Sequence, residues 1–130
     1  MEEKREKLLK SERLDSKKAI EMLFGSRNSS FPAYPIRVVY MQVDSSLSKD
    51  YASILISVPK KKFKRAVKRN LIKRQIREAY RKNKHILIDK LVEKDKKLVL
   101  AFIWLDVSIY ATSVVEERVK KILLHIVDTL

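Results

Sequence analysis

The sequence predicts a small mixed α/β fold, a two-layer sandwich with the element order α-β-β-α-β-α. Three observations predict this class: apolar residues at helical spacing in three segments, two segments rich in β-branched residues, and one nearly unbroken apolar run. A chain of 130 residues suits a single domain over residues 1–130, with the highly charged residues 1–10 as a flexible lead-in.

The first helix is expected over about residues 16–24. Asp15 or Ser16 can cap its start, and Gly25, the only glycine, stands where a helix end favours the left-handed conformation. Residues 26–35, which follow, are rich in Asn, Ser and Pro. We therefore expect a loop or an irregular edge segment there.

Strands are expected at residues 36–43 and 51–58, and the short polar segment between them suits an antiparallel hairpin with a loose loop. The apolar run at residues 98–105 is typical of a strand buried on both faces, in a central or parallel position. A long helix over about residues 65–92 connects the second and third strands, which should be parallel if they share a sheet. An amphipathic helix with Ser113 and Glu116 as a capping box follows the last strand.

The positive charge is concentrated in one segment. Residues 60–84 contain thirteen Lys or Arg and one acid, Glu78, although the whole chain has a net charge of only +14. A protein that is merely rich in lysine would spread this charge, so the concentration indicates a polyanionic partner. Like charges at i, i+4, such as Lys73 with Arg77, destabilise an isolated helix, so this is not simply a solvated surface.

The spacing of the polar residues predicts a single stripe along the long helix. They recur close to 3.6 residues per turn at Asn70, Lys73, Arg77, Arg81 and Lys84. Arginine offers a planar fork for phosphate and lysine offers a mobile point charge, which suits a structured nucleic-acid backbone. The run Lys60, Lys61, Lys62, Lys64 and Arg65 surrounds the turn into the helix, where the helix dipole adds to anion attraction.

Several other kinds of protein are excluded or disfavoured by the sequence. There is no cysteine, and His85 and His125 are isolated, so we expect no catalytic or metal site in this chain. The charged N-terminus does not resemble a secretory signal, and no apolar run is long enough to span a membrane. We expect a soluble, cytoplasmic protein.

The stretch from Ile56 to Tyr80, ISVPKKKFKRAVKRNLIKRQIREAY, resembles the signature of the bacterial ribonuclease P protein family. The similarity runs without a gap over about 25 residues, and a weaker similarity covers most of the chain. It implies an α/β sandwich with a left-handed βαβ crossover, against the usual right-handed rule. It also implies a protein subunit of a ribonucleoprotein endonuclease, in which a catalytic RNA and its magnesium remove the 5′ leader of precursor tRNA. The protein would be monomeric in a 1:1 complex with that RNA.

The resemblance further implies two sets of site residues. The RNA-binding set, facing the catalytic RNA, combines the matched basic positions with their neighbours: Lys60, Lys61, Lys64, Arg65, Lys68, Arg69, Asn70, Lys73, Arg74, Arg77 and Arg81. The second set would line a cleft between the first helix and the sheet for the single-stranded leader: Arg13, Ile20, Phe24, Val38 and Tyr40.

Two positions depart from the family pattern. Leu71 stands where the family has a second arginine after Asn70, and Ile20 stands at a cleft position that is usually aromatic. Replacing an aromatic ring by isoleucine keeps apolar contact but loses base stacking, which contributes about 1–3 kcal/mol per base. The alternative functions are a structural, ribosomal-type RNA-binding protein and, less consistent with the residues, a protein-only nuclease.

Overall fold

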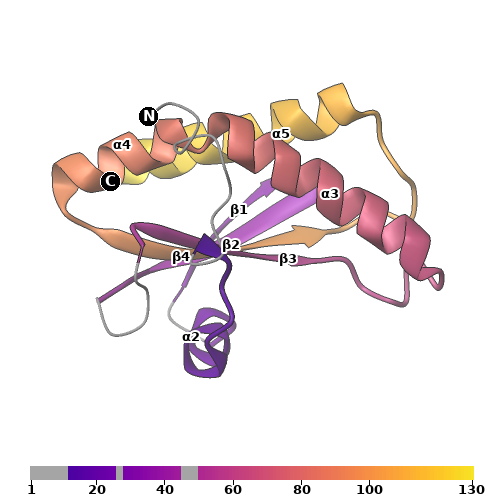
Figure 1. Cartoon of the computed structure of the whole chain (residues 1–130), viewed down its shortest axis with the longest axis horizontal. Helices are drawn as coiled ribbons and strands as arrows, with labels where there is room; N and C mark the ends of the chain where they lie inside the picture. The colour runs from indigo at the N-terminus through magenta and orange to yellow at the C-terminus, as the bar shows by residue number, and fades with distance from the viewer. Residues whose placement is uncertain (1–11, 26–27, 45–49) are drawn as a thin grey trace.

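The computed structural model describes residues 12–25, 28–44 and 50–130 and contains one four-stranded sheet with helices on both faces (Figure 1). The elements in chain order are α2 (Lys17–Leu23), β1 (Ser29–Ala33), β2 (Ile36–Val43), β3 (Ala52–Ser57), α3 (Ala66–Asn83), α4 (His85–Lys94), β4 (Lys97–Trp104) and α5 (Thr112–Thr129). The α/β class is confirmed, with one added strand and a division of the long helix. The expectation of a flexible lead-in at residues 1–10 lies outside the described residues.

The sheet has the order β1-β2-β4-β3, and β4 occupies the interior position that its unbroken apolar run predicts. It pairs antiparallel with β2 and parallel with β3. The predicted hairpin between β2 and β3 is therefore wrong, because β4 lies between these two strands. A short loop between two strands allows a hairpin. It does not prevent a third strand from inserting between them, as β4 does here because its apolar residues need burial on both faces.

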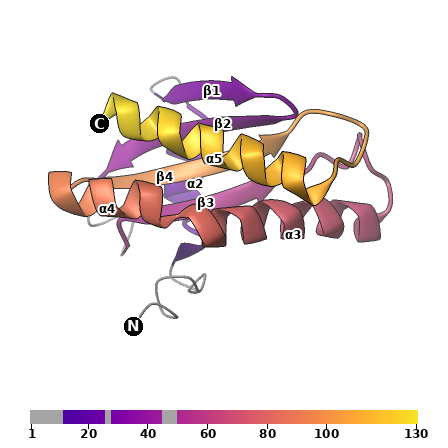
Figure 2. The same ribbon diagram turned by 90° about the horizontal axis from the view of Figure 1, so that it is seen from above.

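The crossover from β3 through α3 and α4 to β4 is left-handed, as the family resemblance implies. In Figure 2 the viewer looks at the helix layer, with β3 and β4 both running from left to right. The chain leaves β3, returns through the helices in front of the sheet, and enters β4 above β3 in that view. This hand is the exception to the usual rule for parallel strands.

Strand β1 lies in the segment that the sequence predicts as a loop or irregular edge. It pairs antiparallel with β2, from Ser29 opposite Tyr40 to Ala33 opposite Ile36, and forms an edge of the sheet. Its serines and its proline are typical of turns, but an edge strand tolerates Pro32 because one side of its backbone needs no partner. The Tyr34–Pro35 peptide bond in the turn to β2 is cis.

The helix ends agree only partly with the sequence. Ser16 caps α2, since its hydroxyl accepts from the Ala19 amide at 3.3 Å. The prediction of a left-handed Gly25 is wrong, because α2 closes through Phe24 and no described glycine has positive φ. The left-handed residue is Asp95, with φ of 52°, at the end of α4.

The capping box predicted for the last helix is also wrong. Helix α5 begins at Thr112 after Ala111 and has no side-chain cap, so Ser113 lies within its first turn. The predicted long helix is divided at Lys84 into α3 and α4. At this point the Asn83 amide donates to the Ala79 carbonyl at 2.8 Å, a side-chain bond that competes with the helical ladder.

Two apolar clusters form the core, one on each face of the sheet. The larger lies under α3, α4 and α5 and includes Ile36, Val38 and Tyr40 of β2. The smaller lies under α2, where Ala19 and Leu23 pack against the other face of the sheet, including Val39. Successive residues of a strand alternate between these clusters. Among the described residues, no helix combines the length and apolar character that crossing a membrane requires.

Candidate RNA interface

The basic segment begins with a rigid turn between β3 and α3. Phe63 is buried and anchors the turn, and the Lys62 amide donates to the Pro59 carbonyl at 3.1 Å. The Arg69 guanidinium donates to the carbonyls of Phe63 and Lys64 at 2.7 and 3.0 Å. Arg69 therefore holds the turn as well as carrying charge.

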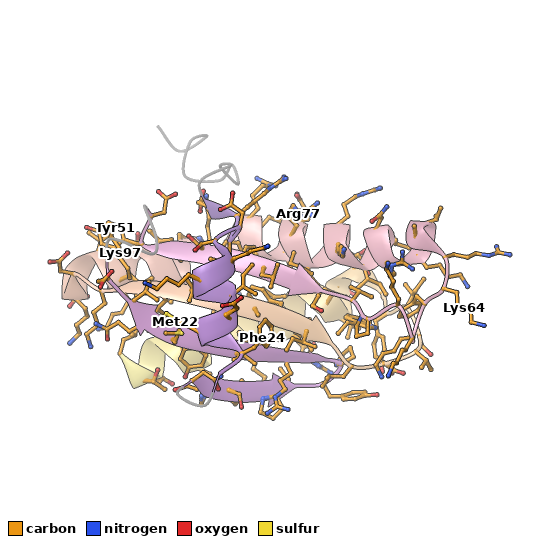
Figure 3. The ribbon with its side chains drawn as sticks, turned by 90° about the horizontal axis from the view of Figure 1, so that it is seen from below. Met22, Phe24, Tyr51, Lys64, Arg77 and Lys97 are labelled. Atoms are coloured by element: carbon orange, nitrogen blue, oxygen red, sulfur yellow. The ribbon has the colours of Figure 1, made fainter. Side chains whose placement is uncertain are left out.

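Most of the other basic residues around the turn and the first turns of α3 are exposed. Those of the RNA-binding set that are exposed around the turn and the first turns of α3 are Lys60, Lys61, Lys64, Arg65, Lys68, Asn70 and Arg74. Lys64 extends from one end of the molecule (Figure 3). A polyanion could approach this end without displacing any packed side chain.

Helix α3 is fixed to the sheet by one apolar face, as its spacing predicts. Ile72, Ile76, Ala79 and Tyr80 are buried on that face. Lys73 and Arg77 follow the adjacent flank and are half-buried, beside the edge of β3. The helix thus presents part of its charge in fixed positions.

A pocket of about 210 Å³ separates α3 from the edge of the sheet. Its lining combines the N-terminal segment, β3 and α3: Arg13, Leu14, Ile54, Leu55, Ile56, Lys73 and Arg77. The N-terminal segment is held there because the Leu14 amide donates to the Ile54 carbonyl at 2.7 Å. The structure therefore brings Arg13, assigned from the resemblance to the leader set, together with two members of the RNA-binding set.

Arg77 is the electrostatic centre of this pocket. Burial lowers its pKa, and the charges of Arg13 and Arg74 lower it further. The guanidinium remains charged at neutral pH because its ordinary pKa is above 12. Three like charges are thus held close together, and an anion such as a phosphate would relieve their repulsion. Arg77 points from α3 toward the side of the N-terminal segment in Figure 3.

Two basic residues at the C-terminal end of the stripe form ion pairs with carboxylates. Arg81 forms an ion pair with Glu78 at 2.6 Å, and Lys84 forms one with Glu12 at 2.8 Å. Lys84 and Glu12 are each only 5% exposed. The prediction that Lys84 belongs to the exposed stripe is wrong, because the division of the helix turns this residue inward.

The leader set does not line one cleft. Ile20 of α2 is half-buried against the cluster under that helix, and Phe24, which follows α2, is 49% exposed. Val38 and Tyr40 are buried on the opposite side, where the Tyr40 hydroxyl lies 3.5 Å from the Thr129 hydroxyl of α5. The prediction that these four residues share a cleft is wrong for Val38 and Tyr40.

The residues of β2 on the α2 side are one position further along the chain. Val39 packs in the cluster under α2, and Met41 is partly buried against it. A shift of one residue moves a strand side chain to the other face. All four residues are mainly apolar, so the sequence does not indicate which pair faces α2. Figure 3 shows Met22 and Phe24 on α2 over this face.

Other functional features escape the sequence altogether. The burial of Lys84 by Glu12 depends on residues 72 positions apart, and no local signal predicts it. Within the described ranges, no group of three or more His, Cys, Asp or Glu side chains is arranged to hold a metal ion. The chemistry that the geometry offers is charge and apolar contact for a polyanion.

Comparisons with known proteins agree with this geometry. The family model described as Ribonuclease P matches residues 8–101. Ribonuclease P protein components of two Porphyromonas gingivalis strains are 44% identical over 119 residues, covering 92% of this chain and 85% of theirs.

Two solved structures share the fold at lower identity. The ribonuclease P protein of Thermotoga maritima has a TM-score of 0.69 at 22% identity, covering 88% of this chain and 96% of that one. A Staphylococcus aureus ribonuclease P protein mutant with defective mRNA degradation activity has a TM-score of 0.70 at 20% identity, covering 90% and 89%.

Proposed function

We propose, because the chain belongs to the ribonuclease P protein family, that it binds the catalytic RNA of ribonuclease P and assists removal of the 5′ leader from precursor tRNA. The observation that carries this proposal is the row of cations fixed on α3 and on the turn before it. The family makes the partner RNA the natural polyanion for this surface.

The proposed role of the basic surface is electrostatic. Two RNA molecules, catalyst and substrate, repel each other through their phosphates, and a protein of net charge +14 can neutralise part of this repulsion. Arg77 and Lys73, held beside the pocket with Arg13, would take phosphates in fixed positions. Exposed residues such as Lys64 would contribute attraction that depends more strongly on salt.

The leader would bind on the α2 face of the sheet. Phe24 offers an exposed aromatic ring on which a base can stack, and Ile20 with Met41 offers apolar contact. The loss of an aromatic ring at Ile20 suggests that fewer bases stack here than in other members of the family. We further propose that catalysis resides in the RNA and its magnesium, in a 1:1 complex in the cytoplasm, where bacterial precursor tRNA is made.

Cleavage at low magnesium tests the proposal. We expect the purified protein, added to the ribonuclease P RNA of the same genome and a precursor tRNA, to stimulate 5′ cleavage under conditions in which the RNA alone is slow. The control substrate is the same precursor tRNA with a leader of only one nucleotide. The protein should stimulate its cleavage less, because the leader contacts are missing. Binding without any stimulation would support the alternative, a structural RNA-binding protein, and would overturn this proposal.

A further inference from the structure

Three exposed apolar side chains lie on two neighbouring connections at one end of the sheet, where the Leu105 amide donates to the Pro35 carbonyl at 2.8 Å. Tyr34, in the turn between β1 and β2, is 57% exposed. Val107 and Ile109, in the loop from β4 to α5, are 65% and 39% exposed. Single exposed apolar residues need no explanation, but several of them on adjacent connections make a candidate contact surface. We call these three residues the loop patch.

The loop patch is held by a hydrogen-bond network and is not a loose loop tip. The Asp106 carboxylate accepts hydrogen bonds from the Tyr110 hydroxyl and from the Val107 amide. The Arg118 guanidinium donates to the Tyr34 carbonyl at 2.9 Å. A surface whose backbone is already fixed loses little conformational freedom when a partner binds.

The network also connects the loop patch to the basic helix. The Gln75 amide of α3 donates to the Tyr110 carbonyl at 3.0 Å and to the Thr112 hydroxyl at 3.2 Å. Leu71 lies one turn earlier on the same flank of α3 and is 38% exposed. This is the position at which the family has an arginine, so the flank facing the loop is more apolar in this chain.

The sheet topology places the loop patch and the basic turn at the same end of the strands. Strands β3 and β4 are parallel neighbours, with Ser57 opposite Ile103 at their ends. The segments that follow them, residues 58–65 and 105–111, must therefore leave the sheet at the same end. Figure 2 shows both connections at the right-hand end of the molecule. The most positive turn of the chain thus adjoins its exposed apolar loop.

We propose that Tyr34, Val107 and Ile109 form a contact surface for an unpaired base of the RNA that binds α3. The inference rests on the proposed function, since it assumes the same RNA partner. An exposed ring beside cations is the combination that proteins use for unpaired bases, where stacking supplements phosphate attraction. A second copy of this chain would bring a charge of +14 toward another +14, so charge favours RNA over self-association.

Salt-dependent binding distinguishes base contact from phosphate contact. The affinity of the full chain for the ribonuclease P RNA would be measured at several salt concentrations for wild type, Tyr34→Ala, Tyr34→Phe and the double variant Val107→Ser/Ile109→Ser. We expect Tyr34→Ala and the double variant to weaken binding by at least about fivefold, the effect of one lost base contact. The slope of affinity against salt should stay unchanged, because no phosphate contact is removed.

Two controls separate this surface from general effects. Tyr34→Phe removes only the hydroxyl and keeps the ring, so it should bind like wild type if the ring makes the contact. Val92→Ser removes an equally exposed apolar side chain, 51% exposed, from α4. In chemical probing of the RNA, one base should be protected by wild type and by Tyr34→Phe and become reactive with Tyr34→Ala.

Three other outcomes would overturn the proposal, and each identifies a different cause. If the loop variants bind within twofold of Val92→Ser while wild type stimulates cleavage, the loop patch does not contact RNA and the proposed function stands. If wild type neither binds the RNA nor stimulates cleavage, the proposed function fails as well. A concentration-dependent dimer of wild type that the double variant abolishes would assign the loop patch to a second copy of the chain.

Discussion

Removing the ammonium of Lys84 should destabilise the fold and leave the RNA contacts intact. Lys84 donates to both carboxylate oxygens of Glu12, at 2.8 and 3.1 Å, and both residues are only 5% exposed. In Lys84→Met the Glu12 carboxylate would stay buried without this ammonium. Breaking a buried pair by removing one partner costs about 3–5 kcal/mol, so we expect the free energy of unfolding to fall by that amount.

A double variant separates the ion pair from simple packing. Glu12→Gln/Lys84→Met removes both charges and keeps similar volumes, and replacing a buried pair by neutral groups is often nearly neutral. We therefore expect the double variant to recover most of the stability lost in Lys84→Met. Urea unfolding followed by circular dichroism measures all three proteins, with midpoint and slope compared.

RNA binding by the same variants supplies the decisive comparison. Below the urea transition, Lys84→Met should bind RNA with the salt slope of wild type, because a buried side chain makes no phosphate contact. A buried ion pair is refuted if the free energy of unfolding of Lys84→Met lies within about 1 kcal/mol of wild type and its RNA binding loses one unit of salt slope. Lys84 would then be an exposed member of the basic stripe.

The remaining predictions concern the pocket, the leader and the loop network. Arg77→Ala should lower the salt slope of RNA binding by about one unit, and Arg81→Ala by less, since Arg81 is paired with Glu78; equal slopes in titrations of the two variants would contradict this. Ile20→Phe should strengthen binding of precursor tRNA by about fivefold or more through base stacking, with no gain for mature tRNA in the same binding assay. The hydrogen bond from Tyr110 holds the pKa of Asp106 below its usual range. The ionised Asp106 carboxylate therefore stabilises the fold above about pH 4, and this stabilisation is lost as the pH falls through the lower pKa that Asp106 has in the folded protein. The difference in urea midpoint between wild type and Asp106→Asn should therefore be larger at pH 7 than at pH 3.

Much of the fold is predictable because its strongest signals are local. The helical spacing of α3 and α5, the alternation of β3 and the unbroken apolar run of β4 each report how one element is buried. The predictions that were wrong concern features that depend on other parts of the chain. Strand β2 pairs with β4 and not with β3, because the apolar β4 must be buried on both faces. Residues 29–33 form a strand because they pair with β2.

The basic surface shows the same division between local and distant causes. Charge density located it, and helical spacing correctly identified the face that packs on the sheet. Spacing alone could not show that Lys84 and Arg81 form ion pairs with Glu12 and Glu78. It also could not show that Arg13 lines the same pocket as Arg77, which is more than sixty residues away in the sequence. The free positive charge of α3 is therefore shifted toward its N-terminal half and the preceding turn.

This shift changes how the two proposed RNA-binding surfaces relate to each other in space. The pocket at Arg77 opens beside Leu55 of β3, whose side chain packs in the cluster under α2. The face proposed for the leader, with Ile20 and Met41, belongs to that same cluster. Had Val38 and Tyr40 formed the cleft, the leader would have run through the packed core between the sheet and α5. With Met41 in their place, the face proposed for the leader lies under α2, and the pocket at Arg77 lies at the edge of β3 that bounds this face. The proposed phosphate contacts and the proposed leader contacts then meet at the edge of β3, where Arg13 and Leu14 join α2 to that strand.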